Sequence, residues 1–230
     1  MTVASVAAAI VGIPALLVAM AHINSLPFSY TIRSWWLLRA LVARAEKLEL
    51  KPEYLFAIVS QSQRCMWDDI DYNQHMNNST YNKNLDFCRI HLLYVVLPKI
   101  MMEPDHNIFA HNAGVFTLFK KEIPPLQPYT IETRIWTWNE KWLFLQHRFV
   151  ITGGNTVQVC CIATSKIVFK LTSGKTVSPA EIFQICGHFD TIHDQVIEAR
   201  RRKSWESAKY LLTMQHDWSN DGRNAKEAKL

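Results

Sequence analysis

Residues 69–81 gather polar side chains of the types that carry out acid–base and nucleophilic chemistry. The run reads Asp-Ile-Asp-Tyr-Asn-Gln-His-Met-Asn-Asn-Ser-Thr-Tyr, with two carboxylates, an imidazole and several amides directly before an apolar pattern of helical spacing. A carboxylate or imidazole can act as base or nucleophile, and free N–H groups at a helix start can hold an oxyanion. The stretch therefore predicts a catalytic site at the start of a helix.

Asp71 is the residue to which we assign the role of base or nucleophile. It lies beside a second carboxylate, Asp69, and an imidazole, His75. A carboxylate at a helix start most often caps the helix or faces its dipole, and for Asp69 we favour that structural role. A carboxylate that only caps a helix does not need an imidazole nearby, so the presence of His75 favours a catalytic role for Asp71.

The start of the predicted helix should bind the substrate through its backbone. N–H groups around Asn77, Asn78 and Ser79, with the helix dipole, are expected to hold the developing oxyanion. The side chains of Asn77 and Asn78 are expected to build the turn and cap the helix. No Gly-rich phosphate loop, serine elbow or metal-ligand spacing appears, so we expect no cofactor and no metal, and the scattered histidines read as surface or hydrogen-bonded residues.

One long helix and a set of strands must position this site. Residues 64–67 look like the end of a strand, and apolar residues from Tyr81 onwards recur at helical spacing, which predicts a helix over 79–97 ended by Pro98. Four strand-like segments rich in Val, Ile, Thr, Phe and Trp follow at 108–123, 129–138, 142–152 and 156–171. Their short connections favour an antiparallel meander, and the pattern predicts an α+β sheet wrapped around a single helix.

The run Asp69–Asn78, followed by Tyr81, resembles the signature of hotdog-fold thioesterases of the 4-hydroxybenzoyl-CoA and acyl-carrier-protein types. It is most similar to the membrane-anchored thioesterase superfamily member 6 group and its fungal relatives, over roughly residues 61–187. The resemblance implies a hotdog fold, a homodimer with sites at the subunit interface, and hydrolysis of an acyl thioester. It also implies a substrate contact for Tyr81 beside those of the helix start.

The same resemblance implies roles for individual residues. The second Asp of the motif, here Asp71, corresponds to the family's catalytic carboxylate. Asn73 and His75 occupy the positions of the two assisting residues of the acyl-carrier-protein enzymes. Glu122 is the nearest match to a further acid that contributes in some members, although related groups lack it.

The first residues predict a membrane anchor. Residues 3–23 contain no Asp, Glu, Lys or Arg, and the apolar run is long enough for a helix to cross a bilayer. Positive charge appears only afterwards, which places the remainder on the cytosolic side of a single-pass protein. We divide the chain into an anchor (1–27), an amphipathic juxtamembrane helix (28–59), a hotdog domain (60–188) and a charged helical tail (189–230). The helix around Trp35 and Trp36 either lies in the membrane interface or packs on the domain.

Composition narrows the remaining choices. The formal net charge is +5, but the basic residues are scattered, which argues against nucleic acid as a partner. The five cysteines show no C-x-x-C spacing and read as reduced, buried thiols. The run Arg200–Lys203 reads as a solvated helix face or, as the alternative, a contact for lipid or a carrier protein. The final Ala228-Lys229-Leu230 resembles a peroxisomal address and gives an alternative localisation.

Two functions from different classes remain open. The first is an acyl thioesterase acting on a fatty acyl or polyketide-like thioester of CoA or acyl carrier protein, in a biosynthetic pathway such as fungal secondary metabolism. The second is a catalytically weak protein at a membrane that binds or scaffolds acyl thioesters. Replacement of Asp71 by Asn should abolish turnover in the first case and leave acyl-CoA affinity unchanged in the second.

Overall fold

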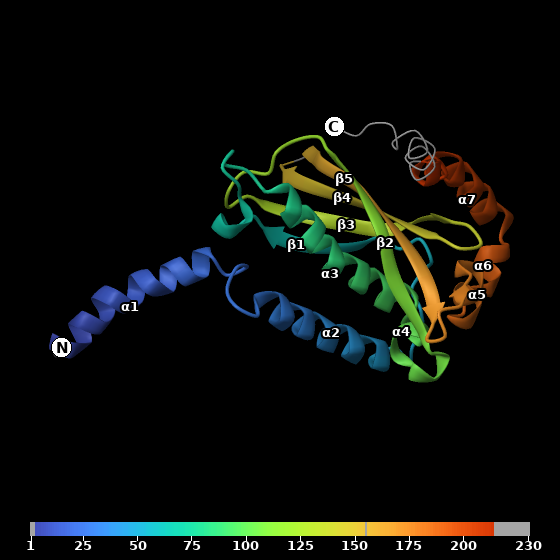
Figure 1. Cartoon of the computed structure of the whole chain (residues 1–230), viewed down its shortest axis with the longest axis horizontal. Helices are drawn as coiled ribbons and strands as arrows, with labels where there is room; N and C mark the ends of the chain where they lie inside the picture. Colours follow the sequence, from blue (N-terminus) through green and yellow to red (C-terminus); the bar gives the residue numbers. More distant parts are fainter. Residues whose placement is uncertain (1–2, 155, 214–230) are drawn as a thin grey trace, which may run out of the picture.

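The computed structural model describes residues 3–154 and 156–213. Its centre is an antiparallel sheet with strand order β1-β3-β4-β5-β2, in which the short β6 pairs with β5. Helix α3 lies across one face of this sheet (Figure 1). The strands are β1 Val59–Arg64, β2 Ile108–Phe119, β3 Pro128–Trp138, β4 Leu143–Gly153, β5 Thr156–Leu171 and β6 Thr176–Val177, and α3 spans Asn78–Val96. The predicted hotdog arrangement of one strand before the long helix and the others after it is confirmed.

The end of β2 differs from the prediction. The strand-like sequence extends to Ile123, but β2 stops at Phe119. The N–H groups of Lys120 and Lys121 both donate to the carbonyl of Cys160, at 2.8 and 3.0 Å, which ends the regular ladder. The Ile123 carbonyl instead accepts from the N–H of Met76, at 2.9 Å, so this segment lies beside the loop that carries His75.

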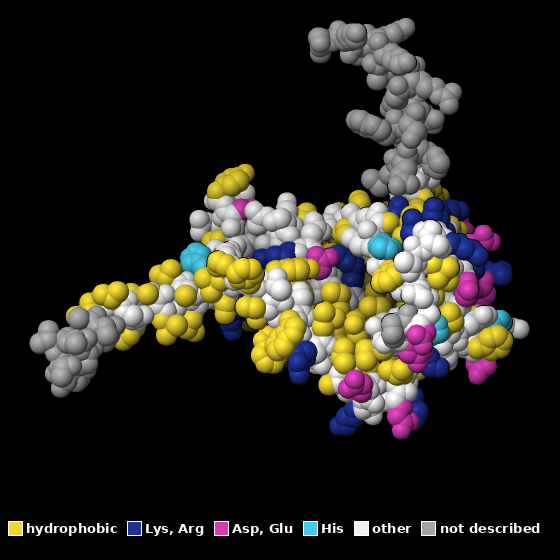
Figure 2. All heavy atoms as spheres, turned by 60° about the horizontal axis from the view of Figure 1, so that its bottom comes forward, with side chains coloured by type: hydrophobic (Ala, Val, Ile, Leu, Met, Phe, Trp, Pro, Cys, Tyr) yellow, Lys and Arg dark blue, Asp and Glu magenta, His cyan; other side chains and the backbone are white. Residues whose placement is uncertain are grey.

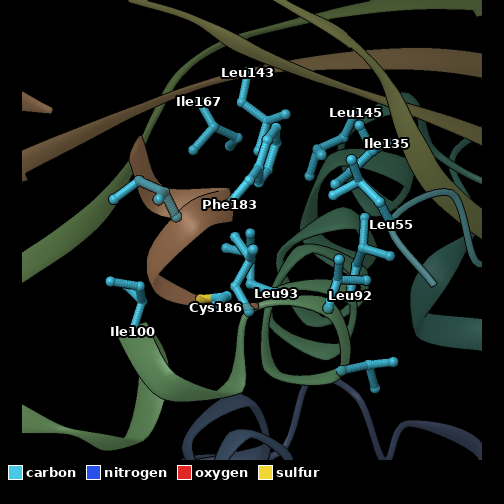
Figure 3. Packing of buried hydrophobic residues seen from close by; sticks show 14 of the residues in the cluster. Leu55, Leu92, Leu93, Ile100, Ile135, Leu143, Leu145, Ile167, Phe183 and Cys186 are labelled. Carbon is cyan, nitrogen blue, oxygen red and sulfur yellow. The ribbon is translucent and has the colours of Figure 1, made fainter. Parts of the chain in front are cut away.

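Two apolar clusters fill the space between α3 and the sheet. One contains Leu92, Ile135, Leu145 and Ile167 and continues to helix α5 (Pro179–Ile185), as Figure 3 shows. The other lies towards the start of α3 and contains Tyr81, Leu85, Ile131, Phe149 and Ala163. Both clusters draw on the inward-facing positions of β3, β4 and β5, as the period-2 pattern of the strands requires.

A buried polar layer separates the two clusters. Thr133, His147 and Ser165 take the inward position between them on β3, β4 and β5, and Arg89 reaches the layer from α3. The His147 ring lies 2.9 Å from each of the Thr133 and Ser165 hydroxyl oxygens, and Arg89 Nη1 donates to Ser165 Oγ at 3.1 Å. Each buried polar group of the layer thus has a hydrogen-bond partner. Of the two alternatives that the sequence left for its histidines, surface or hydrogen-bonded, His147 takes the second.

Two helices precede the sheet, α1 (Val3–Ala21) and α2 (Ser29–Lys47). Within the residues that the structure describes, no helix is both long and apolar enough to cross a bilayer. The predicted transmembrane anchor is therefore not supported. Helix α1 projects from the body, and Figure 2 shows apolar side chains along it. Helix α2 contacts α3 and buries Leu41 and Ala45, while Trp35 and Trp36 stay exposed, so α2 packs on the domain and also presents an apolar outer face.

The chain after the sheet folds back on its outer face. Helices α6 (Phe189–His193) and α7 (Gln195–Ala208) follow α5, and Trp205 lies against Phe144 on the face opposite α3. The predicted solvated face at 200–203 is wrong for Arg201, because its Nη1 donates to the Trp138 carbonyl at 2.8 Å. Elsewhere the connections contain α4 (Pro98–Met102) and two single 3-10 turns, η1 (Trp67–Asp69) and η2 (Pro104–His106). The three residues 228–230 lie outside the described ranges.

The five cysteines are all buried and free, as their apolar neighbours in the sequence predicted. Burial raises the pKa of Cys65, Cys88 and Cys161 to about 12. These thiols stay protonated at neutral pH and behave as small apolar side chains.

Candidate active site

Three of the four predicted catalytic residues, Asp71, Asn73 and His75, lie in a tight loop between η1 and α3. The Asp71 N–H donates to the His75 carbonyl at 3.0 Å, and the Gln74 N–H donates to the Asp71 carbonyl at 3.1 Å. Gln74 takes a left-handed conformation with φ 63°, which closes the turn. The loop is held against the sheet by the Met76 N–H, which donates to the Ile123 carbonyl.

This turn brings Asp71, His75 and Glu122 together. His75 Nδ1 lies 3.8 Å from Asp71 Oδ1, and His75 Nε2 lies 3.7 Å from Glu122 Oε1. The side chains of Asp71 and His75 are 16% and 22% exposed, whereas Glu122 is 74% exposed in the connection after β2. The imidazole therefore lies between two carboxylates, with one side sheltered and the other open. Both distances exceed hydrogen-bond length and describe an electrostatic cluster.

Asn73 contributes through its backbone. Its N–H donates to Asp71 Oδ1 at 2.9 Å and fixes that carboxylate, and its side chain is exposed. A carboxylate oxygen that accepts a backbone N–H is held in one orientation. In this structure Asn73 thus positions Asp71.

The start of α3 is capped as the sequence predicted. Asn77 is the N-cap, and its Oδ1 accepts from the backbone N–H of Ser79 at 2.8 Å and from the Ser79 hydroxyl at 2.7 Å. The Asn77 N–H donates to the Asp69 carbonyl at 2.8 Å. Of the three predicted oxyanion donors, only the Asn78 N–H has no partner within the described part of the chain. The backbone N–H of Asn78 is therefore the one of these three donors that can bind an oxyanion.

An open cavity of about 670 Å³ lies beside His75. Asn78 and Tyr81 line it from α3, and Lys120, Lys121 and Glu122 line it from the segment after β2. Asp71 is not part of its wall, so His75 is the member of the Asp71–His75 pair that faces the cavity.

Tyr81 forms an apolar part of this wall. It is 2% exposed and its ring packs against Phe119 and Phe149. Burial raises the pKa of its phenol well above the ordinary value, so the phenol remains neutral. A substrate would meet Tyr81 as a neutral aromatic surface.

Sequence reasoning missed the two lysines. Lys120 and Lys121 are exposed and give the cavity mouth a positive charge beside Glu122. A Lys-Lys-Glu triplet at the end of an alternating strand was the available signal. The triplet lies at the cavity only because its segment contacts the loop of His75, and these two segments are far apart in the sequence.

Asp69 has a structural role, although its carboxylate does not cap α3 as we expected. It is 1% exposed, and its carboxylate accepts from the Met66 N–H at 3.0 Å and pairs with Lys83 on α3 at 3.2 Å. Asn24, in the connection between α1 and α2, donates to the same carboxylate at 2.7 Å, and the Ser25 N–H donates to Asp68 at 2.5 Å. The N-terminal helices are thereby joined to η1, directly before the loop of Asp71.

The described residues contain no group of three or more His, Cys, Asp or Glu side chains that could hold a metal ion. What the arrangement offers is a sheltered imidazole flanked by carboxylates, one free helix-start N–H, and an open cavity with lysines at its mouth. Such a set can activate water and stabilise an oxyanion.

Comparison with known proteins places these features in a family. Residues 65–185 match the thioesterase-like superfamily. The chain is 33% identical over 145 residues to a probable thioesterase of Saccharomyces cerevisiae, covering 63% of this chain and 62% of that protein. It is 30% identical to the thioesterase poxG of Penicillium oxalicum, covering 58% of this chain and 54% of that protein. The chain thus spans less than two thirds of these relatives.

Among solved structures, the fold is similar to that of YbaW, a probable thioesterase of Escherichia coli. The TM-score is 0.50 at 19% identity, over 55% of this chain and 94% of that chain. At this identity the likeness concerns the fold alone.

Proposed function

The chain belongs to the thioesterase-like superfamily, and from this premise we propose that it hydrolyses an acyl thioester to a free acid and a thiol. The observation that carries the proposal is the position of His75, between Asp71 and Glu122 and on the wall of a cavity at the start of α3. All of these residues lie within the range that matches the superfamily.

In the proposed mechanism, His75 Nε2 takes a proton from water in the cavity, and the resulting hydroxide attacks the thioester carbon. The Asn78 N–H and the dipole of α3 stabilise the oxyanion. The carbon–sulfur bond then breaks, and the leaving thiolate takes the proton from His75. Asp71 stabilises the imidazolium between these steps, with help from Glu122. The sequence assigned Asp71 the role of base or nucleophile, and the cavity wall favours His75 for direct contact with water.

The substrate in this proposal is a thioester of a thiol compound that also bears phosphate. This thiol compound is either CoA or the phosphopantetheine of an acyl carrier protein. Lys120 and Lys121 support this choice, because they place two cations at the cavity mouth where the polar end of such a substrate would lie. The named relatives are fungal thioesterases, which supports a biosynthetic role in a fungal pathway, including secondary metabolism.

We further propose a homodimer formed along β2. This strand pairs with β5 on one side only, and Phe109, Phe116 and Leu118 on it are exposed. A long edge strand with apolar side chains favours pairing with another strand. A second copy joined there would close the open side of the cavity that Phe119, at the end of β2, helps to line.

For localisation we propose attachment to a membrane surface. Exposed apolar side chains on α1, together with Trp35 and Trp36 on α2, support binding in the interface of a bilayer. The peroxisomal alternative rests on the last three residues of the sequence. Co-sedimentation of the whole chain with lipid vesicles tests the first proposal, and a Trp35→Ser/Trp36→Ser variant that sediments equally well would overturn it.

The reaction is tested by thiol release from acyl-CoA thioesters of increasing chain length. The whole chain is compared with His75→Gln, Asp71→Asn and, as a control, Asp190→Asn, which removes an exposed carboxylate on α6. We expect both site variants to lose turnover by about 100-fold or more with unchanged melting temperatures, and the control to match the unaltered protein. Turnover in isotopically labelled water should place the label in the free acid and leave the Asp71 peptide unlabelled.

Two results would redirect the assignment. Label in the Asp71 peptide would identify Asp71 as a nucleophile and overturn the role given to His75. Equal and negligible release by all four proteins, with CoA and carrier-protein thioesters alike, would reject the enzyme and leave the acyl-thioester binding protein.

A further inference from the structure

A second cavity lies on the same side of the sheet, towards the other end of α3. It has a volume of about 660 Å³ and is bounded by α3, α4 and the first half of β2. None of its wall residues also lines the cavity beside His75. Its volume is in the range of small-molecule sites, which span about 300–1,000 Å³. It is therefore a separate candidate binding site.

Most of this wall is apolar. Leu93, Ile100 and Ile167 are at most 6% exposed, and Met101 and Met102 line the edge formed by α4. Unbranched methionine side chains adapt to ligands of different shape. The body of a ligand that fits here must be apolar.

An ion pair with a buried guanidinium and a half-exposed carboxylate interrupts the apolar wall. Arg89 is 6% exposed and pairs with Asp86, whose side chain is 44% exposed. Arg89 also donates to Ser165 Oγ, which in turn lies 2.9 Å from the His147 ring. This network holds the guanidinium in one orientation, and the charge of Asp86 offsets part of the cost of burying it. The cavity thus presents a fixed donor beside an acceptor.

The remaining polar groups decide the charge of the ligand. An anion would gain contact with Arg89 but would face Asp86 and also Glu103 at the rim. A cation would be attracted to Asp86 but would also face Arg89, which already pairs with that carboxylate. Glu103 already pairs with His106 at 2.9 Å, and His111 also lines the cavity. Burial raises the pKa of Tyr30, so its phenol stays neutral and adds no charge to the wall. A neutral group that both donates and accepts satisfies the ion pair best, and a hydroxyl is the simplest such group.

We propose that this cavity binds an apolar molecule that carries a hydroxyl group, with the hydroxyl accepting from Arg89 and donating to Asp86. The site is separate from the proposed thioesterase centre and needs no turnover. Its ligand class is that of medium-chain alcohols and hydroxylated acyl compounds.

The test uses 1-octanol and octanoate as probes, with the whole chain labelled at its methionine methyl groups. Methyl resonances report the position of binding, because Met101 and Met102 line this cavity and Met76 lines the cavity of His75. We expect 1-octanol to shift Met101 and Met102 saturably, and octanoate to bind at least about tenfold more weakly, since its charge faces two carboxylates. Shifts at Met76 alone, or equal affinity for the two probes, would overturn the proposal.

Two variants test the ion pair itself. Asp86→Asn keeps the shape of the side chain and removes its charge, so octanoate should gain about tenfold in affinity and the preference for octanol should disappear. Arg89→Met should weaken octanol binding about tenfold. If Arg89→Met fails to fold, the exposed Asp86 variant still decides the question. Asp190→Asn is the matched control, and an unchanged probe preference in Asp86→Asn would refute the assignment.

Discussion

The buried polar layer makes the stability of this protein depend on pH through His147. Burial, and secondarily the nearby charge of Arg89, lower the pKa of His147 from 6.5 to about 3. In the folded chain the ring is neutral and bonded to Thr133 and Ser165. Below about pH 6.5 the unfolded chain binds a proton at this ring that the folded chain does not. Stability is therefore fully present above that pH and is lost as the pH falls towards 3.

The size of the effect follows from the shift. Within this window each pH unit corresponds to about 1.4 kcal/mol for one proton. Lowering the pH from about 7.5 to about 5 should thus cost roughly 2 kcal/mol of the free energy of unfolding through His147. His188 and His91 act in the same direction, since burial lowers the pKa of each. The whole chain should lose more than His147 alone accounts for.

The assay is urea unfolding of the whole chain, followed by tryptophan fluorescence at several pH values between about 5 and 7.5. His147→Gln keeps hydrogen-bonding groups in the layer and removes the titrating ring. We expect the variant to lose stability less steeply with falling pH, by about one proton, whatever its stability at neutral pH. The exposed His193→Gln serves as control and should retain the full slope. Equal slopes in His147→Gln and the unaltered chain would refute the reasoning.

Three further outcomes follow from the site and the sheet edge. Lys120→Glu/Lys121→Glu should raise KM for acyl-CoA at least several-fold with little change in kcat, and the effect should shrink with added salt, whereas Lys175→Glu should leave KM unchanged. Leu118→Lys on β2 should shift the protein from dimer to monomer in sedimentation velocity, and a monomeric unaltered chain would contradict the proposed interface. Asn77→Ala removes the cap of α3 and should lower the free energy of unfolding by about 1 kcal/mol, measured by urea titration.

Local pattern predicted the parts of this structure that depend on neighbouring residues. The spacing of apolar residues identified α3 to within a residue of its bounds, and the strand pattern at 156–171 matched β5. The capping role of Asn77 followed from its place before the helix. In each case the information lies within a few positions of the chain, where periodicity and cap chemistry act.

The features of the structure that the sequence did not predict depend on contacts between residues far apart in the chain. The position of Lys120 beside His75 arises because the segment after β2 pairs with the loop before α3. The layer of Arg89, His147 and Ser165 draws on one helix and two strands, and no spacing connects them. The catalytic roles of the residues in the loop stay predictions, because the distances between side chains show which groups can interact but not which of them reacts.

The connection between α1 and α2 supports the loop of Asp71, although it lies outside the range of family similarity. Family similarity covers residues 65–185, and a chain trimmed to that range would keep α3 and strands β2 to β6 but would lose β1. It would also lose Asn24 and Ser25, which donate to the carboxylates of Asp69 and Asp68 immediately before the loop. Arg33, which donates to Asn24 at 3.1 Å, would go with them. Asp69 would keep the Met66 N–H and Lys83 as partners, but the contacts that join η1 to the N-terminal helices would be gone. We therefore expect the loop of Asp71 to be held best in a chain that begins before Asn24.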